Sequence, residues 1–146
     1  MNAEKADFYK HKEITDAVIC CFYEVYNTLG YGFLEKVYEN ALLIELEKRG
    51  IRAQAQFSVP VYYDGKLVGE YYCDILVEDV VIVEIKATRS LIPEHEAQLL
   101  NYLKATDKEV GLLFNFGPSP QIKRKVFDNT RKGTNRAQVS NTEIIL

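Results

Sequence analysis

Two acidic residues and a lysine lie on neighbouring stretches that have the pattern of β-strands. The run from Val80 to Ala87 is short, β-branched and apolar on both faces, which predicts a buried strand, yet it contains Glu84 and Lys86. Side chains alternate along a strand, so these two charges share a face. Burying them is costly unless they are paired or bind an ion. The pattern therefore indicates a site for chemistry.

Asp74 supplies a second carboxylate on the preceding strand. If that strand pairs with the Glu84 strand in a hairpin, the two carboxylates lie side by side. Such a pair suits a hard divalent cation, Mg²⁺ or Mn²⁺, held through oxygen ligands. Glu35, in the first turn of a predicted helix, could add a third carboxylate. Lys86 would then hold or activate an attacking water and offset negative charge on a pentavalent phosphorus.

Each of these residues also has a structural interpretation. Glu84 and Lys86 could form a salt bridge at a sheet edge, although the β-branched surroundings argue against an edge. Asp74 could accept backbone hydrogen bonds. Glu35 could be a helix carboxylate favoured by the helix dipole.

The remaining sequence predicts the elements that position these residues. Apolar residues at helical spacing predict two helices, and three alternating or apolar runs separated by tight turns predict a meander of strands. A third helix begins at a proline and leads to a fourth strand, and that crossover should be right-handed and make its two strands parallel. The class is therefore α/β, an αα-βββ-α-β core with a mixed central sheet flanked by helices. The expected helices are 13–29, 34–49 and 93–106, the expected strands are 56–63, 67–77, 80–87 and 110–116, and a short further segment is expected at 122–127.

Length and composition limit the class of protein. The 146 residues, 47% of them hydrophobic, suffice for one compact domain, which we place at residues 13–127 between a flexible N-terminus (1–12) and a basic, flexible tail (128–146). No apolar run has the length of a membrane span, and the charged start lacks the apolar part of a signal peptide. We expect a cytoplasmic protein without membrane contact. Cys20, Cys21 and Cys73 have no metal or redox spacing and are expected to be reduced thiols in or near the core.

The net charge of −3 excludes a protein coated in positive charge, but basic residues gather near the C-terminus. Such a segment could contact the phosphates of a nucleic-acid backbone, with Lys123 and Arg124 binding the strand that is cleaved. The alternative is a solvated surface followed by a disordered tail. The basic residues after Gln121 are Lys123, Arg124, Lys125, Arg131, Lys132 and Arg136.

Four motifs in order resemble a known family. The stretch from Gly32 to Tyr38 fits the GxxExxY signature, and Asp74 followed by Glu84-Ile85-Lys86 resembles the D…ExK core of the PD-(D/E)xK nuclease superfamily. Gln98 and Tyr102 resemble the QxxxY motif of RecB-type and lambda-exonuclease-like members. The chain is thus similar to GxxExxY proteins over roughly residues 14–124. Cys73 stands where the superfamily name places a proline.

The resemblance implies a restriction-endonuclease-like fold and a metal-dependent nuclease. Asp74, Glu84 and the backbone carbonyl of Ile85 would bind Mg²⁺ or Mn²⁺, with Glu35 assisting, while Lys86 would serve the nucleophilic water. The substrate would be nucleic acid, with DNA as the expected substrate and RNA as the alternative. Two other functions stay open: a nuclease fold with weak or no cleavage that binds nucleic acid or protein, and a subunit of a defence or repair assembly. A homodimer is also compatible with the sequence.

Further side chains join the site by the same resemblance. Gln98 and Tyr102 lie four residues apart on one helical face, so both can reach substrate or order a metal-bound water. His95, on the same helix, could shuttle a proton or contact phosphate, or could be a satisfied polar residue. Tyr38 could contact substrate, or could pack against the sheet with its hydroxyl near Glu35.

Overall fold

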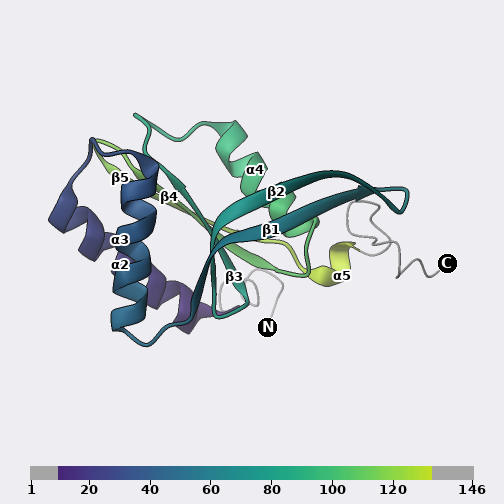
Figure 1. The fold of residues 1–146 in the computed structure, drawn as a ribbon, viewed down its shortest axis with the longest axis horizontal. Coiled ribbons are helices and arrows are strands. Elements are labelled where there is room, and N and C mark those ends of the chain that lie inside the picture. The colour runs from purple at the N-terminus through teal and green to yellow at the C-terminus, as the bar shows by residue number, and fades with distance from the viewer. Residues whose placement is uncertain (1–9, 133–146) are drawn as a thin grey trace.

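A mixed sheet of five strands organises residues 10–132, the part of the chain that this computed structural model describes. Helices α2 and α3 lie on one face of the sheet, and α4 lies on the other (Figure 1). The elements are α2 (Lys12–Leu29), α3 (Glu35–Lys48), β1 (Ala53–Tyr63), β2 (Lys66–Val77), β3 (Val81–Lys86), α4 (Pro93–Lys104), β4 (Val110–Phe116), β5 (Pro120–Val126) and α5 (Asn129–Lys132).

The strand order in space is the same as the order in sequence. Strands β1, β2 and β3 form an antiparallel meander, α4 carries the chain across to β4, which runs parallel to β3, and β5 returns antiparallel to β4. The predicted mixed sheet, meander and parallel crossover are confirmed. β3 is therefore a central strand, which explains why its sequence is apolar on both faces.

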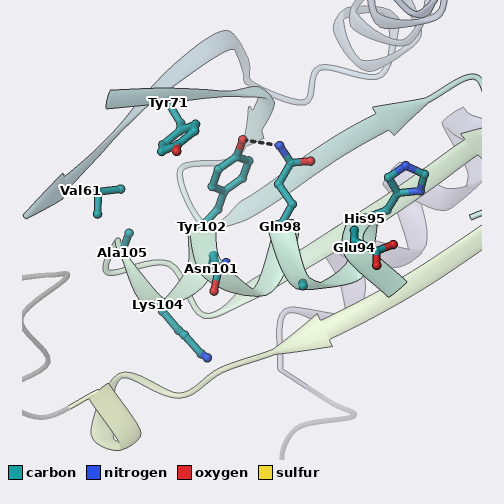
Figure 2. Close-up of a pocket in the computed structure, with 10 residues that line it drawn as sticks. Val61, Tyr71, Glu94, His95, Gln98, Asn101, Tyr102, Lys104 and Ala105 are labelled. Atoms are coloured by element: carbon teal, nitrogen blue, oxygen red, sulfur yellow. Dashed lines mark hydrogen bonds between the residues drawn. The ribbon is translucent and has the colours of Figure 1, made fainter. Parts of the chain in front are cut away.

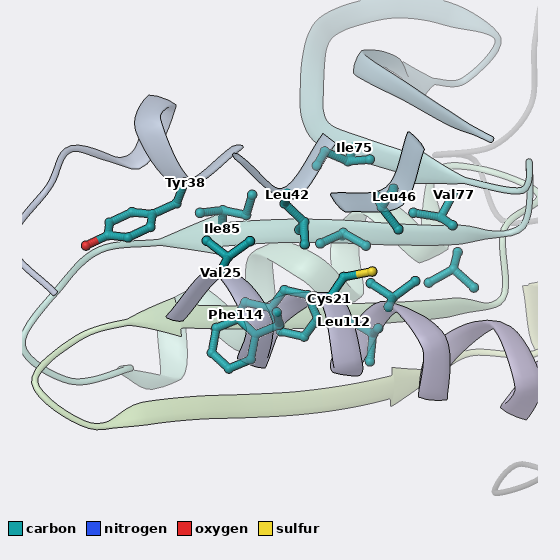
Figure 3. Packing of buried hydrophobic residues seen from close by; sticks show 14 of the residues in the cluster. Cys21, Val25, Tyr38, Leu42, Leu46, Ile75, Val77, Ile85, Leu112 and Phe114 are labelled. Atoms are coloured by element: carbon teal, nitrogen blue, oxygen red, sulfur yellow. The ribbon is translucent and has the colours of Figure 1, made fainter. Parts of the chain in front are cut away.

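Aromatic stacking fixes α2 and α3 against the sheet. Phe22 of α2 stacks on Phe114 of β4 with 4.5 Å between ring centroids, and Tyr38 of α3 stacks on Phe116 at 4.1 Å. Figure 3 shows this core between the helices and the sheet. The buried side chains of α2 lie on one face, as an amphipathic helix requires. They are Thr15, Val18, Cys21, Phe22 and Val25.

Helix α4 packs closely on the opposite face. Its buried residues Leu99 and Leu103 meet Ile82 of β3 and Leu113 of β4 in a second core. At Gly111 of β4, an added Cβ would come within 2.6 Å of the Leu99 side chain, so the glycine permits the close approach. This packing positions the polar face of α4 beside the end of β3.

The hairpin of β1 and β2 bends at Gln56 and Asp74. These residues face each other by register but do not pair, and Gln56 has a left-handed φ of 54°. On one side of the bend, Ile75 faces the α2/α3 core, whereas Cys73 on the other side faces the α4 core. Residues 57–73, which we call the hairpin arm, therefore extend over α4 (Figure 1). The expected first strand began at residue 56, but the observed strand begins at Ala53 and passes through the bend.

Both of the segments predicted to be flexible extend into the described part of the chain. Residues 129–132, assigned to the tail, form the short helix α5, and Lys132 is buried because its Nζ donates to the carbonyls of Thr106 and Lys108, both at 2.8 Å. Lys10, assigned to the flexible N-terminus, pairs with Asp128 and with Glu109. The rest of both predicted segments, 1–9 and 133–146, lies outside the described residues.

The cysteines and the lengths of the helices were also predicted from the sequence. Cys21 and Cys73 are buried free thiols as expected, but Cys20 is exposed on α2. Between residues 10 and 132, no helix combines the length and apolarity that crossing a bilayer requires.

Candidate active site

Asp74 and Glu84 face each other at the point where β2 and β3 separate. The ladder between these strands ends at the pair Ile75–Val83, and the next positions are Asp74 and Glu84. The Asp74 N–H donates to Glu84 Oε1 (2.9 Å), and the Ile85 N–H donates to Asp74 Oδ2 (2.7 Å). Each carboxylate thus binds a backbone amide of the opposite strand, which fixes its orientation. The structure thus brings the two carboxylates together.

Burial makes this pair of carboxylates reluctant to ionise. Desolvation raises the pKa of Asp74 to about 6, against the lowering effect of the hydrogen bond from Ile85. Desolvation, together with the negative charge of Asp74, raises the pKa of Glu84 to about 8. Two adjacent carboxylates with raised pKa values favour the arrival of a neutralising cation.

The second oxygen of each carboxylate is open to a ligand. No described group donates to Asp74 Oδ1 or Glu84 Oε2, and no buried side-chain oxygen within residues 10–132 lacks a hydrogen-bond partner. These two oxygens therefore reach solvent. They lie on the face of the sheet that α4 covers, because Glu84 follows Ile82 at strand spacing.

Glu35 brings further negative charge to the pair. It is the first residue of α3, is exposed, and its charge raises the pKa of both Asp74 and Glu84. The helix dipole favours a carboxylate at this position. The structure thus places Glu35 close enough to act electrostatically on the carboxylate pair.

Glu39, one helical turn after Glu35, is a site residue that the sequence analysis missed. It is only 3% exposed, accepts a hydrogen bond from Gln56 Nε2 (2.8 Å), and raises the pKa of Asp74. Its spacing of four residues from Glu35 on the same helical face was the available signal. The bend at Gln56 is what brings the amide to Glu39.

Lys86, Gln98 and Tyr102 form a chain of hydrogen bonds beside the carboxylates. Lys86 Nζ donates to Gln98 Oε1 (3.0 Å), and Gln98 Nε2 donates to the Tyr102 hydroxyl (3.0 Å). The positive charge of Lys86 lowers the pKa of both Asp74 and Glu84. Burial, together with the charge of Glu84, raises the pKa of Tyr102 to about 12, so this hydroxyl stays protonated. The structure thus brings these three side chains together.

The alternative of an edge salt bridge between Glu84 and Lys86 is wrong. Strand β3 lies between β2 and β4, and the described ion pairs do not include these two residues. Asp74 does accept a backbone hydrogen bond, as its structural interpretation proposed. That bond leaves its other oxygen for chemistry.

His95 and Tyr38 have structural roles in this conformation. His95 Nδ1 accepts a hydrogen bond from the Ile92 N–H (3.2 Å) and caps the first turn of α4. Tyr38 is fully buried; its hydroxyl donates to the Gly30 carbonyl (2.7 Å) and accepts from the Phe33 N–H (3.2 Å). The ring and hydroxyl of Tyr38 are thus occupied in holding the loop before Glu35, and its assignment to substrate contact stays a prediction.

Lys123 and Arg124 lie on opposite faces of the edge strand β5. By register, Glu84 pairs with Leu113 and Leu113 with Lys123, so Lys123 is on the α4 face, two strands from Glu84. Arg124 is on the α2 face and donates to the Lys10 carbonyl. Arg124 therefore does not share a face with Glu84 in this structure, and its assignment to substrate binding stays a prediction.

The C-terminal basic residues do not form one track. Lys125 pairs with Glu96 of α4 (2.7 Å), and Lys132 is buried against backbone carbonyls. Arg136 lies outside the described residues. The basic side chains that were expected to contact phosphates together thus make separate contacts within the fold.

The donor set fits a small, hard divalent cation. Within residues 10–132, no group of three histidine, cysteine or acidic side chains is already assembled to hold a metal. The pair of Asp74 and Glu84 nevertheless presents two accessible carboxylate oxygens. Mg²⁺ commonly uses one or two carboxylates and keeps several waters. The donor types of this pair therefore fit Mg²⁺ and do not fit a structural zinc site.

Comparison with known proteins identifies a family and a related structure. The family model described as the PD-(D/E)XK nuclease superfamily matches residues 12–126, and the mixed sheet with flanking helices is consistent with its restriction-endonuclease-like fold. A solved structure described as "Crystal structure of SSO0001" is 17% identical, with a TM-score of 0.47, over 64% of this chain and 50% of that one. This chain thus spans half the length of that structure. A search of curated proteins found no match.

Proposed function

The chain belongs to the PD-(D/E)XK nuclease superfamily, and we propose that it is a metal-dependent nuclease that hydrolyses phosphodiester bonds of DNA. One observation carries the proposal. Asp74 and Glu84 meet at the opening between two strands, each with a free oxygen, and the amine of Lys86 is held beside them. The spacing of Gly32, Glu35 and Tyr38 and the pair Gln98–Tyr102 support a GxxExxY protein of the RecB-type branch.

The proposed cation is Mg²⁺, with Mn²⁺ as a substitute. Asp74, Glu84 and the Ile85 carbonyl would hold it, and Glu35 would assist from α3. When bound, the metal supplies a Lewis acid for the phosphate, a water of lowered pKa and a template for in-line displacement. The raised pKa values of the two carboxylates support this assignment, because a bound cation would offset the burial and the neighbouring negative charges that raise them.

Lys86 has the geometry to serve the reacting atoms. An ammonium group has three donors, and Gln98 accepts one of them. The other two can hold the attacking water and a nonbridging phosphate oxygen. Tyr102 accepts from Gln98 and so keeps the amide oxygen turned toward Lys86. Gln98 and Tyr102 therefore position Lys86, while Lys86 is the residue proposed to act on the reactants.

A second function is favoured by the charge distribution. The net charge is −3, and the basic residues Arg124, Lys125 and Lys132 are engaged within the fold. Extended DNA contact normally needs a broad basic surface. The chain could therefore act as a weakly cleaving subunit of a defence or repair assembly in which another subunit supplies the DNA track, or as a homodimer.

Cleavage assays with matched variants test the proposal. Labelled single- and double-stranded DNA and RNA are incubated with the purified chain in Mg²⁺, Mn²⁺ or EDTA. We expect metal-dependent cleavage of DNA that falls by at least about 100-fold in Glu84→Gln and Lys86→Met. Glu24→Gln, a change at an exposed carboxylate of α2, is the control and should retain activity. Cleavage that persists in Glu84→Gln would overturn the assignment.

A further inference from the structure

A cavity of about 760 Å³ lies between the hairpin arm and α4. Val61 and Tyr71 line it from the arm, and Gln98, Asn101 and Tyr102 line it from the helix (Figure 2). This volume falls within the range of about 300–1,000 Å³ that is typical of small-ligand sites. The cavity exists because the bend at residues 56 and 74 carries the arm over α4.

The lining has the chemistry of a site for a flat, polar-edged ring. Tyr71 is 54% exposed, and its ring lies tilted against that of Tyr102, with 6.1 Å between centroids. The amide of Asn101 can both donate and accept hydrogen bonds. The charges in the lining, Glu94 and Lys104, are opposite in sign. An electrically balanced cavity with aromatic walls suits a nucleobase better than a phosphate group.

The cavity is adjacent to the candidate active site. Gln98 lines the cavity and also accepts the hydrogen bond of Lys86 Nζ, so one side chain separates the cavity from the amine. A strand whose phosphate lies at Asp74 and Glu84 would therefore have its neighbouring base beside Gln98. A paired base inside a duplex is stacked on its neighbours and cannot enter such a cavity, whereas an unpaired base can.

We propose that this cavity binds an unstacked base of a single-stranded nucleic-acid segment next to the bond that is cleaved, with Tyr71 as its stacking surface. The inference rests on the proposed nuclease function and specifies its substrate as single-stranded ends, flaps or gaps. Asn101 contacts the edge of the base, and Gln98 links occupancy of the cavity to the position of Lys86.

Binding measurements without metal test this site separately from catalysis. Fluorescence anisotropy in EDTA compares a short thymidine oligonucleotide, its RNA counterpart and a duplex of the same length. We expect Tyr71→Ala to weaken binding of the single strand by about 5- to 100-fold, the range for loss of one base–aromatic stack. Tyr71→Phe keeps the ring and should bind like the wild type.

Tyr72 provides a matched control on the same strand. It is 51% exposed, next to Tyr71 in sequence, and does not line the cavity; its hydroxyl donates to Glu70 on the other side of the arm. Tyr72→Ala should leave binding unchanged. Equal losses in Tyr71→Ala and Tyr72→Ala would overturn the site, as would equal affinity of the wild type for single strand and duplex.

The two proposals fail in different ways. Tyr71-dependent binding without any metal-dependent cleavage would support the cavity and reject the nuclease. Cleavage that requires Glu84, together with unchanged single-strand binding in Tyr71→Ala, would support the nuclease and reject the cavity. If the chain binds the RNA oligonucleotide more tightly and this binding also depends on Tyr71, the cavity is supported and the strand that it binds is RNA.

Discussion

The buried carboxylate of Glu84 should make the metal-free protein less stable at high pH. The folded chain raises the pKa of this carboxyl from 4.5 to about 8, so the folded state binds its proton more tightly than the unfolded state. Stability then falls as the pH rises from about 4.5 to about 8. Glu84→Gln removes the ionisation and keeps an oxygen that can accept from the Asp74 N–H.

The size of this effect follows from the two pKa values. They differ by about 3.5 units, and each unit corresponds to about 1.4 kcal/mol, so ionisation of Glu84 costs up to about 5 kcal/mol in the folded state. Above about pH 8 we expect Glu84→Gln to raise the free energy of unfolding by about 2 to 5 kcal/mol. Near pH 4 the two proteins should differ little, because the carboxyl is then neutral.

Urea denaturation in EDTA at about pH 4.5 and about pH 9 measures the difference in free energy of unfolding between the two proteins. The slope of this free energy with urea concentration should be the same in both. Adding Mg²⁺ at about pH 9 should stabilise the wild type more than Glu84→Gln, because the cation offsets the charge that the variant lacks. Glu24→Gln, at an exposed carboxylate, should show no such pattern. A Glu84→Gln protein no more stable than the wild type at about pH 9 would refute the burial of a costly charge.

Two further outcomes follow from the site and its supports. The apparent affinity for Mg²⁺, measured by calorimetry, should increase between about pH 6 and about pH 8, because Asp74 and Glu84 must lose protons to bind the cation. The increase should reach at most about tenfold per pH unit, and an affinity that does not change with pH would contradict the role of these carboxylates. Gly117→Ala should lower the free energy of unfolding, measured by urea denaturation, by at least about 2 kcal/mol, because the new Cβ would overlap the Thr88 carbonyl oxygen. Gly69→Ala, whose Cβ meets only Tyr71 at 3.8 Å, is the control, and equal stability of the two variants would contradict this packing.

The parts of the site that sequence predicted are those governed by local periodicity. Alternation along a strand placed Glu84 and Lys86 on one face, and helical spacing placed Gln98 and Tyr102 together. The short turn between β2 and β3 made Asp74 the neighbour of Glu84. Each of these relations needs only the type of element and the shortest connection between elements.

The parts that sequence did not predict depend on tertiary contacts. Gln56 reaches Glu39 because β1 adopts a left-handed φ at a residue that is not glycine, which composition does not indicate. Arg124 turned away from the site because the register of β5 decides which face each of its residues occupies. Lys132 was expected in a solvated tail, but three acceptors around its amine hold it in the fold.

The bend in β1 also affects how this molecule meets other chains. β1 is an outer strand of the sheet, and an unbroken outer strand invites another polypeptide to extend the ladder. Here the left-handed residue Gln56 interrupts the strand, and Pro60, four positions later, has no amide proton to offer. This border is therefore a poor template for intermolecular β-addition. The same bend that lies beside the candidate active site thus also disfavours fibril-like self-association.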